Sequence, residues 1–116
     1  MKEIQDTWAK KAKHEGYRSR ASYKLLQINE PHKLIQNSNM IIELGSAPGG
    51  WSQVISILKK DSTKCHAFDL LPMEKVEGIN FHNLDLYSNE FEEFVSDLSI
   101  EPDLILSDMS VNLSGI

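Results

Sequence analysis

The chain has 116 residues, the length of one domain, and a domain of this size buries roughly two thirds of its unfolded surface. Hydrophobic residues make up 41% and charged residues 25%, which excludes a disordered or fibrous chain. No apolar run approaches the roughly 20 residues of a membrane span, and the first residues lack the apolar segment of a secretory signal. The single cysteine, Cys65, can form no internal disulfide. We therefore expect a cytoplasmic protein without contact to a membrane.

Charge is divided unevenly along the sequence, and the net charge is −5. Residues 1–35 hold eight of the twelve lysines and arginines against four acids, whereas residues 36–116 hold four bases against thirteen acids. We therefore separate a basic N-terminal helical arm (1–35) from an acidic body (36–116). The basic arm indicates a phosphate-bearing partner, and a solvated, charged helix is the alternative that charge alone leaves open.

Hydrophobic periodicity predicts an alternation of helices and strands along the chain. The expected helices are residues 6–15, closed by Gly16, and residues 21–29, 51–60 and 89–98. The expected strands are residues 40–44, 64–69, 79–84 and 104–106. The connection over residues 69–79 holds Pro72 and Gly78 and is too short for a full helix. Such an alternation is typical of an α/β protein with a parallel sheet.

Four carboxylates stand at the ends of the four expected strands: Glu43, Asp69, Asp85 and Asp108. Ligands of open parallel sheets bind outside the carboxyl ends of the strands. One acid at a strand end means little, because a strand has to end in something polar. Four in a row predict a site rich in acceptors, suited to a ligand that carries hydroxyls, an amine or a cationic centre.

The first strand leads into a glycine-rich loop, Gly45-Ser46-Ala47-Pro48-Gly49-Gly50. Its spacing departs from the G-x-G-x-x-G pattern of dinucleotide-binding proteins. Pro48 also removes a backbone N–H that a pyrophosphate would need. The loop therefore favours a ligand without phosphate, such as S-adenosylmethionine, over NAD. Asp69 follows at the end of the second strand, where its carboxylate can accept hydrogen bonds from ribose hydroxyls.

Four sequence runs, in the same order and at similar spacing, resemble the FtsJ/RrmJ family of methyltransferases. They are GYRSRASYKLLQI (16–28), IELGSAPGGWSQV (42–54), DLLPM (69–73) and LILSDMSVNLSG (104–115). The resemblance covers almost the whole chain, and the runs around SAPGGWSQ and SDMSVNLSG are its specific parts. It implies a Rossmann-like, S-adenosylmethionine-dependent fold that methylates a ribose 2′-hydroxyl of RNA. For the most similar bacterial members, the implied partner is ribosomal RNA or the large ribosomal subunit.

The resemblance also implies roles for individual residues. The implied cofactor site consists of Gly45, Gly49, Gly50, Trp51, Asp69, Asp85 and Asp108. Within it, Asp69 binds the ribose, Asp85 lies near the adenine, and Asp108 lies beside the transferred methyl group. Lys24 and Asp108 match the first lysine and the aspartate of the family's Lys-Asp-Lys-Glu catalytic set. The expected RNA contacts are Arg18, Arg20 and Lys24, and an ordinary surface role is the alternative for both arginines.

Three positions depart from the family pattern: Glu43 replaces an aspartate, and Ser110 and Val111 replace an Ala-Pro pair. The family's second catalytic lysine and its glutamate lie on later strands, beyond the 116 residues. We therefore expect a sheet truncated after the fourth strand, and a chain that binds cofactor with at most trace catalysis. The last strand, residues 104–106, would then form an apolar edge open to self-association or to another chain.

Two other functions compete with the methyltransferase interpretation. A degenerate module would hold cofactor or RNA without turnover, and cofactor binding without methyl transfer would distinguish it. An NAD-dependent enzyme is disfavoured by the loop around Pro48. The histidines and Cys65 lack the spacing of metal ligands, so we expect no metal.

Overall fold

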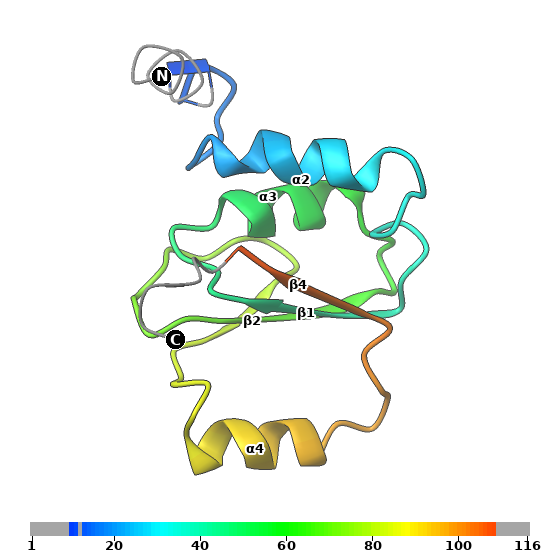
Figure 1. The fold of residues 1–116 in the computed structure, drawn as a ribbon, viewed down its shortest axis with the longest axis vertical. Helices are drawn as coiled ribbons and strands as arrows, with labels where there is room; N and C mark the ends of the chain where they lie inside the picture. Colours follow the sequence, from blue (N-terminus) through cyan, green and yellow to red (C-terminus); the bar gives the residue numbers. More distant parts are fainter. Residues whose placement is uncertain (1–9, 12, 109–116) are drawn as a thin grey trace, which may run out of the picture.

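The computed structural model describes residues 10, 11 and 13–108, which form a four-stranded sheet with helices on both faces (Figure 1). The strands are β1 (Met40–Leu44), β2 (Lys64–Phe68), β3 (Asn80–His82) and β4 (Leu104–Ser107). The helices are α2 (Ala21–Asn29), α3 (Gly50–Leu58) and α4 (Asn89–Ser96). Neighbouring strands run parallel, in the order β3-β2-β1-β4. The expected fold class, an α/β protein built on a parallel sheet, is therefore confirmed.

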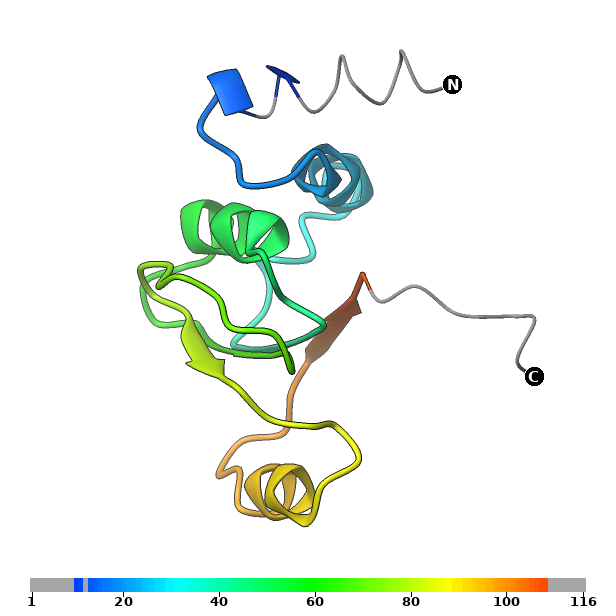
Figure 2. The ribbon, with the colours of Figure 1, turned by 90° about the vertical axis from the view of Figure 1, so that its left-hand side faces the viewer.

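Helices α2 and α3 lie on one face of the sheet and α4 lies on the other, as two perpendicular views show (Figures 1 and 2). Successive side chains of a strand point to opposite faces. Ile41 of β1 and Cys65 and Ala67 of β2 accordingly form one hydrophobic cluster with Val54 and Ile55 of α3. The helices with assigned bounds have eight or nine residues, and none in the described part of the chain is long and apolar enough to cross a bilayer.

The face of the sheet beneath α4 is aromatic. Phe68 of β2 is fully buried, and its ring centroid lies 4.9 Å from that of Phe91 and 5.2 Å from that of Phe94. His66 and His82 extend the cluster, with Nδ1 of His66 3.0 Å from Nε2 of His82. Burial lowers the pKa of both imidazoles, and His82 adds to the effect at His66. Both shifts favour the neutral form of the imidazoles beneath α4.

The predicted elements are confirmed in type, and they differ from the structure at their ends. Helix α2 has the predicted bounds, whereas α3 and α4 each end two residues early. Strand β3 has three residues instead of the predicted 79–84, because Ile79 and Leu84 donate their N–H groups within turns on either side of it. The connection over 69–79 contains no helix, as predicted.

Parts of two sequence predictions lie outside the described residues. Of the predicted helix 6–15, the structure describes residues 10, 11 and 13–15, and Lys10, Lys11, Lys13 and His14 are helical. Ser110 and Val111 also lie outside the described residues.

Strand β4 forms one edge of the described sheet. It pairs with β1 on its inner side, from Leu104 opposite Ile41 to Ser107 opposite Leu44. Leu104 and Leu106 pack against the hydrophobic core, whereas the intervening Ile105 is 60% exposed. An edge strand with an exposed apolar side chain is a place where another strand can add.

We expect the chain to self-associate through β4. Ile105→Lys places a charge on this edge strand and should shift the chain towards monomer, because charged edge strands resist pairing. Sedimentation velocity over a range of concentrations measures the shift. Ile57→Lys is the matched control, since Ile57 is 68% exposed on α3. An unmodified chain that stays monomeric at high concentration would contradict this expectation.

Candidate functional site

The four predicted carboxylates lie at the same end of the sheet and line two cavities. Asp69 directly follows β2, Asp108 directly follows β4, Asp85 lies three residues beyond β3, and Glu43 is inside β1. Asp69 and Asp85 line a pocket of about 400 Å³, whereas Glu43 and Asp108 line a cavity of about 20 Å³. Gly45 lines both. The two cavities therefore share the first residue of the glycine loop in their walls.

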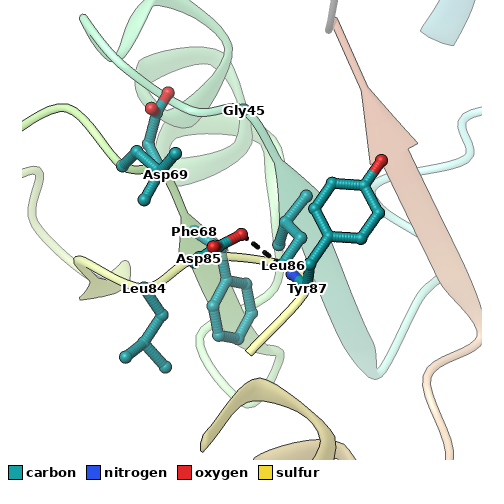
Figure 3. A pocket seen from close by; sticks show the side chains of 8 residues that line it. Gly45, Phe68, Asp69, Leu84, Asp85, Leu86 and Tyr87 are labelled. Atoms are coloured by element: carbon teal, nitrogen blue, oxygen red, sulfur yellow. Dashed lines mark hydrogen bonds between the residues drawn. The ribbon is translucent and has the colours of Figure 1, made fainter. Parts of the chain in front are cut away.

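The larger pocket is mainly apolar (Figure 3). Besides the two acids, it is lined by Gly45, Phe68, Leu70, Leu84, Leu86 and Tyr87. Its volume falls within the roughly 300–1,000 Å³ that is usual for small-molecule sites. Apolar walls with two carboxylates suit a ligand that has a flat ring and hydroxyl groups.

The backbone around Asp69 fixes the position of its carboxylate. Its Oδ2 accepts a hydrogen bond from the N–H of Ala47 at 2.8 Å, and its Oδ1 accepts one from the N–H of Leu71 at 2.9 Å. A carboxylate oxygen can accept more than one hydrogen bond, so both oxygens can still bind ligand hydroxyls. Asp69 therefore joins the glycine loop to the connection that follows β2.

Asp85 is an exposed acid at the rim of the larger pocket. Its Oδ1 accepts a hydrogen bond from the N–H of Tyr87 at 2.9 Å, drawn as the dashed line in Figure 3. This turn orients the carboxylate, and the Tyr87 side chain itself is 94% exposed. Asp85 can therefore offer an acceptor to the outer edge of a ligand in the pocket.

The smaller cavity contains two buried polar groups. Glu43 is 1% exposed, and its Oε1 accepts a hydrogen bond from the Ser52 hydroxyl at 2.5 Å. Burial raises the pKa of Glu43 to about 7; the bond from Ser52 opposes the rise, and the charges of Asp108 and Asp69 add to it. Ser46 Oγ lines the same cavity, is buried and has no hydrogen-bond partner among the described residues. Such an unpaired hydroxyl costs about 1–3 kcal/mol, so the cavity is suited to a polar ligand group.

Two glycines let the loop pass close to the N-terminal arm. Gly49 has φ +117°, a backbone conformation that residues with a side chain rarely adopt. A Cβ there would lie 2.6 Å from Nη1 of Arg18. A Cβ on Gly50 would lie 2.8 Å from the buried Ser22 Oγ. Larger residues at either position would push the loop away from α2.

Trp51 docks α2 onto α3. Its indole N–H donates to the carbonyl of Ala21 at 2.7 Å, and the side chain is 5% exposed. Trp51 also lines the smaller cavity. Its position therefore combines packing between the helices with contact to the site.

The remaining predicted residues lie around the start of α2. Arg20 is exposed at the N-terminal cap of α2, and Lys24 is exposed within the helix. Ser19 and Ala21 line the cavity that also holds Asp108. The start of α2 therefore borders the predicted catalytic aspartate, but Lys24 and Asp108 form no ion pair in the structure.

Sequence reasoning missed three features of the site. Leu70 and Leu86 line the larger pocket, and each follows a predicted acid, so the repeated Asp-Leu pair was an available signal. Ser46 was not singled out within the glycine loop. Arg18 also donates to backbone carbonyls 30, 56 and 57 residues away, which no local pattern could reveal. In the described ranges, no group of three or more histidine, cysteine or acidic residues could hold a metal ion.

The sequence profile of the FtsJ-like methyltransferases matches residues 17–116. The chain belongs to the FtsJ-like methyltransferase family. It is 42% identical over 115 residues to ribosomal RNA large subunit methyltransferase E of Marinobacter nauticus and 43% identical over 115 residues to the protein of the same name from Archaeoglobus fulgidus. These alignments cover 97% and 99% of this chain but 56% and 59% of the relatives. The FtsJ-like chain thus spans about half the length of the curated relatives it matches.

A solved structure shares the fold of this FtsJ-like chain. It is described as a ribosomal RNA methyltransferase from Plasmodium falciparum, and it matches with a TM-score of 0.62 at 28% sequence identity. The superposition covers 86% of this chain and 60% of that one. The family and the fold implied by the sequence runs are therefore both confirmed.

Glu43 should make the stability of the chain depend on pH. Its pKa is about 7 in the folded protein against an ordinary value of 4.5, so the folded protein holds an extra proton between these values. The free energy of unfolding should therefore fall as the pH rises through this window, by on the order of 3 kcal/mol in total. Glu43→Gln resembles the neutral acid and should remove most of this fall, as measured by urea denaturation below and above the window.

Glu101→Gln is the control for this experiment, because it alters an exposed carboxylate. It should keep the pH dependence of the unmodified chain. A Glu43→Gln variant that loses stability with rising pH as strongly as the unmodified chain would show that another group is responsible.

Proposed function

We propose that this chain binds S-adenosylmethionine in the two cavities that share Gly45 and forms part of an enzyme that methylates a ribose 2′-hydroxyl of ribosomal RNA. The observation that carries the proposal is the division of the four acids between an apolar pocket and a small polar cavity that share Gly45. The family supports the type of reaction, and the names of the relatives support ribosomal RNA as the substrate.

The larger pocket has groups suited to the adenosine part of the cofactor. The Asp69 oxygens, oriented by Ala47 and Leu71, can accept the ribose hydroxyls. The apolar walls can bury the purine ring, and Asp85 can accept an N–H from its outer edge.

The smaller cavity has groups suited to the methionine part. Asp108 would attract a cationic ligand, and the positive charge of that ligand would favour the ionised form of Glu43. The hydroxyl of Ser46 would gain the partner that it lacks. When bound, S-adenosylmethionine supplies a methyl group already activated by its sulfonium. The protein therefore has to align the attacking hydroxyl and manage one proton, and we assign Lys24 and Asp108 to this positioning.

The exposed residues of the basic arm are the proposed contacts to RNA. Arg20 and Lys24 can bind phosphate oxygens, which orient a nucleic acid without reading its sequence. The guanidinium of Arg18 is bonded to backbone carbonyls, so the proposal rests mainly on the other two. Ribosomal RNA or the large ribosomal subunit as partner would place the protein in the cytoplasm.

A binding module without catalysis is the second candidate function. It is favoured because Lys24 and Asp108, the two residues matched to the implied catalytic set, form no ion pair with each other. Such a module would bind cofactor, RNA or both without methyl transfer, so turnover separates the two candidates.

Calorimetric titration with S-adenosylmethionine tests the cofactor site. The unmodified chain should bind saturably, and both Asp69→Ala and Asp85→Ala should weaken binding by roughly ten-fold or more, since a lost hydrogen bond to a charged group costs about 1.5–3 kcal/mol. Asp61→Ala is the control, because Asp61 is exposed and does not line either cavity. A folded chain that shows no binding would overturn the proposal.

Methyl transfer by the 116-residue chain alone should reach only trace levels. The groups that it contributes align the reactants, and the implied base, the second lysine, is missing from the matched runs. Transfer of radiolabelled methyl groups to ribosomal RNA measures the rate, with a longer family member as the positive control. A rate equal to that of the longer protein would show that Lys24 and Asp108 suffice.

A further inference from the structure

Arg18 is bonded to three backbone carbonyls that belong to two separate segments. Its Nη1 donates to the carbonyl of Pro48 at 3.1 Å and to that of Glu74 at 2.7 Å, and its Nη2 donates to that of Lys75 at 2.8 Å. Pro48 belongs to the glycine loop, whereas Glu74 and Lys75 belong to the connection between β2 and β3. A planar guanidinium reaches these acceptors from two nitrogens in a fixed fork, whereas an ammonium would have to make all of its bonds from one nitrogen.

The two segments that Arg18 joins are walls of the candidate site. Gly45 begins the glycine loop, and Asp69 and Leu70 begin the connection; all three line the larger pocket. The connection over residues 69–79 has no regular structure to satisfy its carbonyls. Side chains donate hydrogen bonds to these carbonyls instead. Arg18 donates to the carbonyl of Glu74. Asn83 donates to those of Asp69 and Leu70, and Ser56 donates to that of Glu77.

The backbone of Arg18 is itself held by α3. Gln53 accepts the N–H of Arg18 at 2.7 Å through Oε1 and donates through Nε2 to the carbonyl of Gly16 at 3.1 Å. The absence of a side chain at Gly49 leaves room for the guanidinium, since a Cβ there would lie 2.6 Å from Nη1. The arrangement therefore fixes Arg18 at both its backbone and its side chain.

We propose that Arg18, a residue of the N-terminal arm, is a positioning residue for the cofactor site. It sets the distance between the glycine loop and the β2–β3 connection. The proposal rests on the proposed function, because it takes S-adenosylmethionine as the ligand of the pocket. Arg18 lines neither cavity, so it acts through Pro48, Glu74 and Lys75 rather than by touching the ligand.

Charge and positioning predict opposite effects when Arg18 is removed. S-adenosylmethionine has a net positive charge at neutral pH, so losing a nearby arginine should tighten binding if Arg18 acted only through its charge. Loss of the link between the two walls should weaken binding, because the pocket would no longer be preformed. The sign of the change in the dissociation constant therefore distinguishes the two roles.

The experiment compares Arg18→Ala and Arg18→Lys in the full chain by calorimetric titration with S-adenosylmethionine. Arg18→Ala should raise the dissociation constant by roughly ten-fold, the usual size of a coupling between sites. Arg18→Lys keeps the charge and should bind more tightly than Arg18→Ala but less tightly than the unmodified chain. Hydrogen exchange should become faster at the amides of residues 46–50 and 71–76 in both variants, while the amides of β1 and β2 stay protected.

Three matched controls accompany these variants. Lys64→Ala removes one positive charge from an exposed position at the start of β2, away from both cavities, and should leave the affinity unchanged. Glu74→Ala and Lys75→Ala remove exposed side chains but keep the carbonyls that Arg18 binds, so they should also bind as the unmodified chain does.

An unchanged or lower dissociation constant in a folded Arg18→Ala variant would overturn the proposal. If Arg18→Ala does not fold, Arg18→Lys decides: affinity equal to that of the unmodified chain overturns the proposal, and weaker binding supports it. If the unmodified chain itself binds no cofactor, the proposed function fails instead. In that case hydrogen exchange tests the link made by Arg18. Faster exchange in the Arg18 variants, confined to residues 46–50 and 71–76, supports the link, and unchanged exchange overturns it.

Discussion

Three consecutive amide groups of the glycine loop are bonded to the end of β2, and the position of the whole site depends on them. Gly45 and Ser46 donate their N–H groups to the carbonyl of Phe68 at 2.8 and 3.1 Å, and Ala47 donates to the carboxylate of Asp69. These bonds carry the pairing of β1 with β2 beyond the last residue of β1. They also occupy donors that a phosphate would otherwise bind, and Pro48 has none to add. The expected preference for a ligand without phosphate is therefore supported by the backbone as well as by the glycine spacing.

The burial of Glu43 at the site lowers the stability of the fold. An acid that is 1% exposed within a strand is unfavourable when ionised, and its single bond from Ser52 does not offset the loss of water. The folded chain therefore tends to keep it protonated. The same burial raises the pKa of Cys65 to about 12, with Glu43 adding to the effect, so this thiol is an inert part of the core. A cationic ligand would offset the cost of ionising Glu43.

The sequence predicted the type of each element because the relevant signals are local: apolar spacing, glycines and a proline at the helix ends. It did not predict the short β3, whose limits depend on turns at Ile79 and Leu84. The four acids were expected along one edge, and the structure divides them between two cavities. Glu43 points to the same face as Ile41, towards α3, as a period of two residues requires. The partners of Arg18 and Trp51 are 30 or more residues away, so only the folded chain identifies them.

The basic arm and the acidic body differ in charge, but the described part of the arm is packed against the body. The described part of the arm is bonded to α3 through Gln53 at Gly16 and Arg18, and through Trp51 at Ala21. These bonds come from one helix that begins at the glycine loop. An RNA bound by the exposed arm residues, as proposed, would therefore be held by the helix that begins at the glycine loop. Because an already activated methyl group requires mainly alignment of the reactants, this junction would be the chain's contribution to the proposed reaction.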